Sequence, residues 1–469
     1  MLFHSFEFMI LLFITFMLFY SFPKQRIYLL ALVNILFYGA SGISYLVLFM
    51  LVSLITYVCA LHLDKSYYKI LYTIGILVNL LNLAFFKYTG FILKNLEKII
   101  GITFPWQEHL LAKIMLPVGI SFYTFQLIAY LVDVKRKEIK PCDSFISFWV
   151  FISFFGQLIA GPIMRGKEFI PQILNVQKNP FTLSNIKYGF YYITMGLAKK
   201  IIFADFLASK ADFYFSQVMN LNTLDAWFAA YLFAFQIYFD FSAYSEIAVG
   251  IGHLFGLRLK LNFKSPYISG NPSEFWKRWH ITLSSWIKDY IYIPLGGAKK
   301  GVFLQYVNLI IAMALSGLWH GAAWTFIIWG TYHGVLSVLH KIYRKNISFN
   351  RNNKLYKLIS IFVFFHLTTI GWVFFRAGSF NDALYMIKEM ITLSNMTYSP
   401  RYFIYFGFIA FLYCIHLLEY FIRKNDITLT KLWEKYFPPF IRAAAYIGIL
   451  IILILFTKTE ESSFIYFQF

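Results

Sequence analysis

The stretch SGLWHGAAWTFIIWGTYHG, residues 316–334, has the composition of a membrane helix but carries two histidines, His320 and His333. Lipid solvates an imidazole poorly, so an ionisable side chain in such a run usually faces the protein interior or a partner. Gly317 and Gly321 form a small-xxx-small pair, which lets another helix approach closely beside His320. On one ideal helix the two histidines would lie roughly 220° apart, so they could not reach the same atom. We expect a functional role for His320 and a structural one for His333.

The composition of the whole chain places it in a membrane. Of 469 residues, 59% are hydrophobic and 14% are charged, whereas average soluble domains are roughly a quarter charged. This excludes an ordinary soluble enzyme and a disordered chain. Several apolar runs are marginal or broken by Gly and Pro, so we predict an all-α polytopic fold with about 10–12 transmembrane helices plus amphipathic and re-entrant helices. No internal repeat or soluble domain is evident, so residues 1–469 are expected to form one integral membrane unit.

The net charge of +20 arises largely from short basic patches between apolar runs, such as PKQR at 23–26 and KRKEIK at 135–140. Such patches are typical of topology signals and of contacts with anionic lipid, and no nucleic-acid motif competes with that interpretation. PKQR and the later DKSYYK are basic, while the GASGIS turn between them is not, which predicts an N-terminus outside the cytoplasm. The three cysteines show neither a disulfide framework nor a metal-ligand spacing, and we predict no metal site.

Residues 258–302 differ from the rest of the chain because they contain no uninterrupted span and are rich in Trp and Tyr. Within EFWKRWHITLSSWIKDYIYI, residues 274–293, large apolar side chains recur at helical spacing with basic residues elsewhere. The pattern predicts an amphipathic helix that lies in the membrane interface or dips into the protein. His280 stands on this helix close to Thr282 and Ser284, a combination that suits a water-accessible pocket.

Two carboxylates interrupt the apolar run QIYFDFSAYSEIAVG, residues 236–250. Asp240 stands four residues before Tyr244, and Glu246 follows. Acidic side chains within a span usually belong to a functional site or a polar network, so proton-coupled transport stays open as a function. A paired-carboxylate glycosidase is disfavoured, because positions six apart face opposite sides of a helix.

In GQLIAGPIMR, Gln157 lies at a predicted helix break, and broken helices at membrane depth line cavities.

Taken in order, these segments resemble bacterial membrane-bound O-acyltransferases, and most closely the branch of alginate and peptidoglycan O-acetyltransferases. The resemblance covers about residues 115–335 and is carried by LPVGISFYTFQ, GQLIAGPIMR, YFDFSAYSEIAVGIGHLFG, FWKRWHITLSSWIKDYIYIPLGG and GLWHGAAWTFIIWGTYHG. Outside this core it rests on length and hydrophobicity. It implies a many-helix bundle around a central tunnel that opens toward both faces of the membrane.

The resemblance also implies roles for individual residues. His320 would act as general base, and His280, forty residues upstream, would orient it or stabilise an oxyanion. Lys277 and Arg278 could attract the phosphates of a donor, although contact with lipid explains them equally well. Seven further residues are expected to line the tunnel or support the site: Asp240, Tyr244, Glu246, Gln157, Trp319, Trp279 and Ser284.

The implied reaction moves acetyl from a cytoplasmic donor, acetyl-CoA, with no bound cofactor. Acetyl would leave on the outer side, to an extracytoplasmic SGNH-type acetyltransferase or another acceptor, and end on an envelope polysaccharide. The lipid membrane is the other expected partner, and the bacterial cytoplasmic membrane the expected location.

Other functions remain open from sequence. D-alanyl transfer to teichoic acid is the runner-up within the family. A proton-coupled transporter would use the acids and histidines as a relay, although transporters commonly carry inverted repeats, and none is evident. A scaffold without catalysis is the third class.

Overall fold

A computed structural model describes residues 3, 5–101, 106–299, 301–347, 353–393, 395–456 and 464–465. Every regular element in these ranges is helical, which confirms the predicted all-α fold. The α-helices are α1 (Phe6–Ser21), α2 (Arg26–Gly39), α3 (Ile43–Leu61), α4 (Tyr68–Leu83), α5 (Thr89–Ile100), α6 (Gln107–Lys113), α7 (Ile120–Lys135), α8 (Phe145–Ser153), α9 (Gly166–Leu174), α10 (Leu183–Ala198), α11 (Asp205–Phe215), α12 (Thr223–Leu254), α13 (Pro272–Phe275), α14 (Ile281–Ile287), α15 (Val302–His320), α16 (Trp324–Asn346), α17 (Lys354–Arg376), α18 (Phe380–Thr392), α19 (Arg401–Lys424), α20 (Asp426–Tyr436) and α21 (Pro439–Phe456). Three π-helical segments join some of them: η2 (Ala84–Tyr88), η4 (Lys199–Ala204) and η7 (Lys288–Tyr292).

Five helices in the described part of the chain are long and apolar enough to cross a membrane: α3, the continuous α4–η2–α5, α15, α17 and α19. The bent pairs α1–α2 and α20–α21, with bends of 115° and 119°, raise the number to seven if each pair is one span. The protein is therefore a multi-pass membrane protein, as predicted. This number is lower than the about 10–12 crossings that we expected. The helices α12 and α16 are long enough but not apolar enough to count as spans, and α7 and α8 are shorter than a span of about 20 residues.

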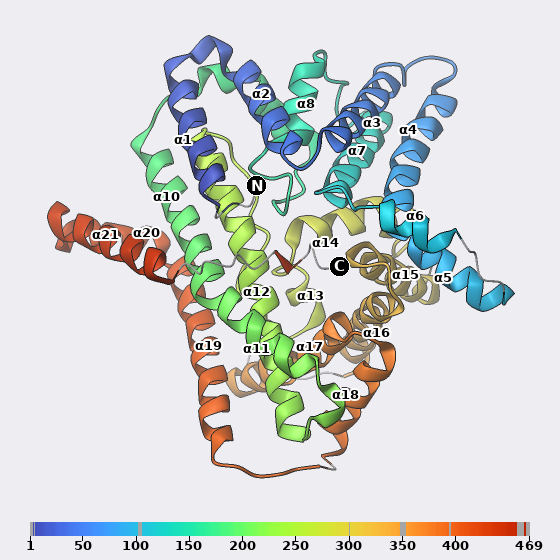
Figure 1. Ribbon diagram of the computed structural model, residues 1–469, viewed down its shortest axis with the longest axis vertical. Coiled ribbons are helices and arrows are strands. Elements are labelled where there is room, and N and C mark those ends of the chain that lie inside the picture. Colours follow the sequence, from blue (N-terminus) through green and yellow to red (C-terminus); the bar gives the residue numbers. More distant parts are fainter. Residues whose placement is uncertain are drawn as a thin grey trace.

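The 32-residue helix α12 is the central element of the fold, and nearly all of its side chains are buried. It contacts α10, η4 and α11 on one side and α17, α18 and α19 on others. Figure 1 shows it running through the middle of the molecule. A helix surrounded in this way is hydrophobic on all faces, and its acidic side chains must find partners inside the protein.

Glycines set the spacing between α15 and α16. A Cβ at Gly317 would lie 2.1 Å from the carbonyl oxygen of Phe326, and one at Gly330 would lie 2.2 Å from that of Met313. The predicted close approach beside His320 is therefore present, and its partner is the next helix of the chain. The run quoted at the outset is two helices, because the chain is extended at Gly321, where a Cβ would collide with the Phe326 ring at 2.0 Å.

The predicted amphipathic helix over 274–293 is wrong as a continuous element. The structure has the short helices α13 and α14 followed by η7, with a break at His280, whose φ of +40° is left-handed. The expected inward face is nevertheless confirmed, because Phe275, Trp279 and Trp286 are all buried. In Figure 1, α13 and α14 lie near the centre, between α12 and the α15–α16 pair.

Candidate active site

His320 is the last residue of α15 and lies inside the protein rather than against lipid. Its exposed fraction is 2%. The imidazole centroid lies 4.9 Å from that of Trp319, 5.1 Å from Trp329 and 5.3 Å from Phe375. Edge-on contacts with these aromatic rings hold the imidazole in a fixed position within the bundle.

Lys87 holds the end of α15 in place, and the sequence analysis missed it. Its ammonium group, in η2, donates to the carbonyl oxygens of Trp319 at 2.6 Å and His320 at 3.1 Å, and to Ser121 Oγ at 3.4 Å. The last carbonyls of a helix have no partner within it, and a cation there also interacts favourably with the helix dipole. The signal available in the sequence was a single lysine within an apolar run, "LAFFKYTG".

His280 comes from a different segment, at the residue that precedes α14. Its fully buried ring lies 4.6 Å from that of Phe241 and 5.9 Å from that of Trp319. Neither ring nitrogen has a hydrogen-bond partner within the described residues. His280 lies outside the candidate spans, and burial lowers its pKa to about 3, so the imidazole is neutral at physiological pH.

Asn262 fixes the strained turn at His280. Its carbonyl oxygen accepts from the Ile281 N–H at 3.0 Å, and its Oδ1 accepts from the Thr282 hydroxyl at 2.6 Å. The Thr282 hydroxyl also accepts from the Ile163 N–H at 3.0 Å. Left-handed backbone at a non-glycine residue persists only where the surroundings determine it, and such positions cluster at functional sites.

The two imidazoles therefore meet at one side chain, the indole of Trp319. Trp319 is itself buried and its Nε1 donates to the Ser121 carbonyl at 3.5 Å. This arrangement places the imidazole of His320 and the neutral imidazole of His280 around one indole in a water-poor interior, which suits general acid–base chemistry.

The other residues predicted to support the site are Trp279, Ser284 and Gln157. Trp279 is fully buried, with ring centroids 4.8 Å from Trp372 and 5.0 Å from Phe263. The Ser284 hydroxyl donates to the Trp279 carbonyl at 3.2 Å and so stabilises the break at His280. Gln157 lies just after α8 and donates through Nε2 to the Phe151 carbonyl at 2.8 Å, and its Oε1 is buried without a partner.

Asp240 and Tyr244 belong to a neighbouring cluster on α12. Asp240 Oδ1 forms an ion pair with Lys200 Nζ at 3.0 Å, and the same ammonium lies 2.8 Å from Asp205 Oδ1. Asp240 Oδ2 accepts from the Ile465 N–H at 2.8 Å, and the described residues Phe464 and Ile465 are buried in the interior. The Tyr244 ring lies 4.3 Å from that of Phe464. This cluster adjoins the histidines through Phe241, which contacts both His280 and Phe464.

Glu246 lies in a separate ionic cluster. Its Oε1 accepts from Lys199 Nζ at 2.6 Å and from the Arg423 guanidinium, and both cations also bind Glu419 Oε1 at 2.8 Å. The sequence analysis missed Lys199, Glu419 and Arg423, although charged residues within apolar runs were visible in "MGLAKKIIF" and "HLLEYFIRK".

The two basic residues proposed for donor binding lie toward the surface. Lys277 is exposed, and Arg278 is paired with Glu274 at 3.0 Å and donates to the Lys264 carbonyl at 3.0 Å. No group of three or more His, Cys, Asp or Glu side chains is placed to hold a metal ion in the described ranges.

These features define the class of protein as an all-helical, multi-pass membrane protein with a buried histidine pair. Residues 71–381 match the membrane-bound O-acyltransferase family, MBOAT, and the chain belongs to this family. Both histidines and the motif-bearing core from 115 to 335 fall within the matched range.

Named relatives share most of the chain. It is 36% identical over 405 residues to a peptidoglycan O-acetyltransferase of Helicobacter pylori, covering 80% of this chain and 75% of that protein. It is 37% identical over 377 residues to a probable alginate O-acetylase AlgI of Pseudomonas aeruginosa, covering 79% and 71%. Identity to a teichoic acid D-alanyltransferase of Streptococcus thermophilus is 29% over 300 residues, covering 58% and 70%.

Proposed function

We propose that the chain moves acetyl from a cytoplasmic donor across the membrane for O-acetylation of an envelope polysaccharide. The relatives named for peptidoglycan and alginate O-acetylation support this reaction at 36–37% identity. The proposed acyl transfer rests mainly on one observation, which is that two buried imidazoles, His320 and His280, both contact the indole ring of Trp319. The donor we propose is acetyl-CoA, with no bound cofactor, and the location is the bacterial cytoplasmic membrane with the N-terminus outside.

In the proposed step, His320 accepts the proton of the acceptor hydroxyl as its oxygen attacks the thioester carbonyl. The new C–O bond forms, the C–S bond breaks, and the proton passes to the leaving thiolate, so the imidazole returns to its neutral form. A positioned general base typically contributes about 10²–10⁴-fold to the rate. His280, neutral and buried, donates a ring N–H to the developing oxyanion.

The acceptor and the passage that it uses complete the proposal. Acetyl leaves through a central tunnel to an extracytoplasmic SGNH-type acetyltransferase, or to another acceptor that carries it to the polysaccharide.

The alternatives have weaker support. The D-alanyl transferase relative is less identical and matches a smaller share of this chain than the O-acetylation relatives. A proton-coupled transporter needs acidic side chains that can release their protons, whereas Asp240 and Glu246 are each held by a lysine at 3.0 Å or less.

The test is the replacement of each histidine in a deletion strain complemented with the full chain. His320→Ala is expected to lower envelope O-acetyl by about 100-fold or more, the range of a lost general base. His280→Ala is expected to lower it as well, while both variants insert at wild-type abundance. His62→Ala, at the exposed end of α3, is the matched control and should retain full acetylation.

The readout is mass spectrometry of released wall and exopolysaccharide fragments. Wild-type acetylation with His320→Ala at normal abundance would refute the enzymatic role and favour a scaffold. Added mass corresponding to alanine rather than acetyl would favour the D-alanyl reaction.

A further inference from the structure

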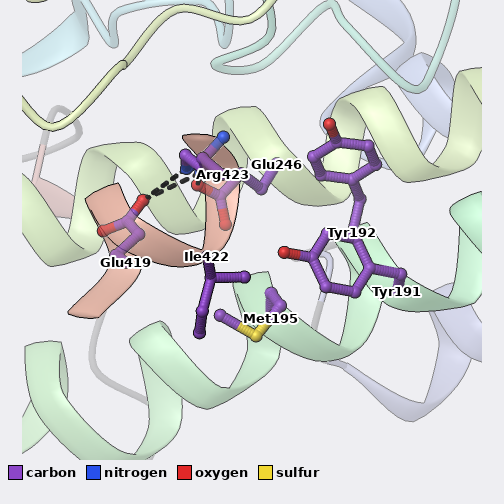
Figure 2. A pocket seen from close by; sticks show the side chains of 7 residues that line it. All are labelled: Tyr191, Tyr192, Met195, Glu246, Glu419, Ile422 and Arg423. Carbon is purple, nitrogen blue, oxygen red and sulfur yellow. Dashed lines mark hydrogen bonds and ion pairs between the residues drawn. The ribbon is translucent and has the colours of Figure 1, made fainter. Parts of the chain in front are cut away.

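The hydrogen bonds of Asn262 end beside a proposed catalytic histidine rather than between helices of the bundle. The ionic cluster around Glu246 has the opposite character, because it joins helices: Figure 2 shows Arg423 of α19 held against Glu246 of α12 and against Glu419. Asn262 lies in the segment that links α12 to α13, and its side chain is fully buried. Its place in the fold therefore connects it with the site.

The backbone on both sides of His280 is paired with the segment that contains Asn262. The Lys264 N–H donates to the Arg278 carbonyl at 2.9 Å, and the Ile281 N–H donates to the Asn262 carbonyl at 3.0 Å. His280 lies between these two bonds, with a φ of +40° and a ψ of +56°. The two bonds therefore bracket the one residue at which the chain leaves the helical path.

The Asn262 side chain makes the contacts that a substitution can remove. Its Oδ1 accepts from the Thr282 hydroxyl at 2.6 Å and from the Thr282 N–H at 3.3 Å. Its Nδ2 has no partner within the described residues, so the side chain acts through one oxygen. The Thr282 N–H is among the first of α14, and such groups have no partner within their own helix. Asn262 thus fixes where α14 begins.

Without these contacts, the local sequence favours a continuous helix through His280. The large apolar side chains of 274–293 keep a helical spacing across it, and left-handed backbone is costly at a residue that has a Cβ. A change to helical backbone would redirect the imidazole. In the structure this ring lies 4.6 Å from the Phe241 ring and 5.9 Å from the Trp319 indole, which His320 also contacts.

We propose that Asn262 is a positioning residue for acetyl transfer. It holds His280 in the left-handed conformation, and this conformation directs the imidazole toward Trp319, where its N–H meets the developing oxyanion. Asn262 acts through His280 and not on the substrate. The inference rests on the proposed function, because the role of His280 in acetyl transfer makes its direction matter.

The experiment measures acetyl transfer from labelled acetyl-CoA in membranes that contain the full chain. Asn262→Ala is expected to lower the rate at saturating donor about tenfold or more and to leave the donor concentration for half-maximal rate unchanged, because the oxyanion forms only in the transition state. Asn34→Ala is the matched control, since Asn34 is also fully buried and its Oδ1 accepts the Phe155 N–H at 3.0 Å. It should keep the wild-type rate per inserted protein.

The His280→Asn background adds a readout that a merely structural role would not move. Asparagine is among the few residues with a Cβ that adopt left-handed backbone routinely, and its side chain still offers an N–H donor. This variant should be slower than wild type but less dependent on Asn262, so that Asn262→Ala causes at least a threefold smaller fold-loss in it. Equal fold-losses in the two backgrounds would overturn the inference.

Failure of the inference and failure of the proposed function give different results. If His320→Ala is inactive while Asn262→Ala transfers acetyl at the wild-type rate, only the positioning role is refuted. If His320→Ala keeps the wild-type rate, the proposed function fails and the inference falls with it. Should Asn262→Ala not insert, Thr282→Val removes the hydroxyl without changing the shape of the side chain and Thr282→Ser keeps it. A slow Val variant beside an active Ser variant is expected, and equal rates would refute the positioning role.

Discussion

Lys87 links the first part of the chain to the proposed catalytic histidine through two backbone carbonyls. Its three ammonium protons match the three acceptors, the carbonyls of Trp319 and His320 and the hydroxyl of Ser121. Because the lysine holds backbone rather than the imidazole itself, it acts as a positioning residue. It fixes where α15 ends and therefore where the His320 ring is placed.

Replacing Lys87 with Met removes these hydrogen bonds while it keeps most of the side-chain length. Hydrogen bonds to charged groups contribute about 1.5–3 kcal/mol, so a shift of His320 is expected to lower acetyl transfer about tenfold or more. O-acetyl per unit of inserted protein is the measurement. Lys87→Arg should retain part of the activity. Lys94→Met, at an exposed site on α5, should have no effect, and equal activity of Lys87→Met would refute the positioning role.

The sequence allowed prediction of the histidines but not of their surroundings. His320 and His280 stand in motifs that resemble a family. The expense of an imidazole in lipid marks His320 independently, and the nearby Thr282 and Ser284 mark His280. Their neighbours Phe375 and Lys87 come from segments far away in the chain, and no local pattern predicts such contacts. Lys87 was the exception that carried a local signal, since a charge within a span is costly unless it has partners.

At the scale of elements, the pair α15–α16 depends on residues without side chains. Gly317 and Gly330 face each other so closely that the Cα of Gly330 would lie 3.2 Å from a Cβ added at Gly317. Small residues at such positions let two backbones approach, and packing rather than the hydrophobic effect holds helices together in a membrane. His320 and Trp329 are placed by this contact, one on each helix.

Gly317→Ala is expected to destabilise the protein, because the new methyl group would meet the Phe326 carbonyl at 2.1 Å. Overpacking typically costs about 1–3 kcal/mol, and backbone cannot move aside as a flexible side chain can. Thermal unfolding of the purified protein in detergent is the measurement. Gly407→Ala in α19 is the control, since nothing lies within 4 Å of its added Cβ. Equal midpoints for both variants would contradict the close-packing interpretation.

Periodicity predicted the inward face of the segment 274–293 but not the break within it. Phe275, Trp279 and Trp286 follow a helical period, and all three are buried as expected. The break at His280 depends on Asn262, whose hydrogen bonds to Ile281 and Thr282 cross between two separate segments. Helical spacing reports which side chains face the core, whereas long-range hydrogen bonds decide whether the backbone stays helical.

At the scale of the whole molecule, buried charges join α10, α12 and α19. The adjacent lysines of η4 serve different clusters: Lys199 binds Glu246 and Glu419, and Lys200 binds Asp205 and Asp240. A π-helical segment alters the direction of successive side chains, and such segments are frequent at functional sites. The acids were predicted as a site or a network, and their lysine partners show that they form a network that ties the bundle together.

Lys200→Met should therefore destabilise the entire bundle. Removal of one partner leaves Asp240 buried without its charge partner, which typically costs about 3–5 kcal/mol. The double variant Lys200→Met, Asp240→Asn also neutralises that aspartate, so its loss of stability is expected to be smaller than the sum of the two single losses. Unfolding midpoints and free energies of the four proteins in a double-mutant cycle are the measurement.

Lys210→Met, at an exposed position of α11, is the control and should leave stability unchanged. Additive losses would show that the pair contributes no coupling, and the ionic clusters would then be consequences of the packing rather than its cause.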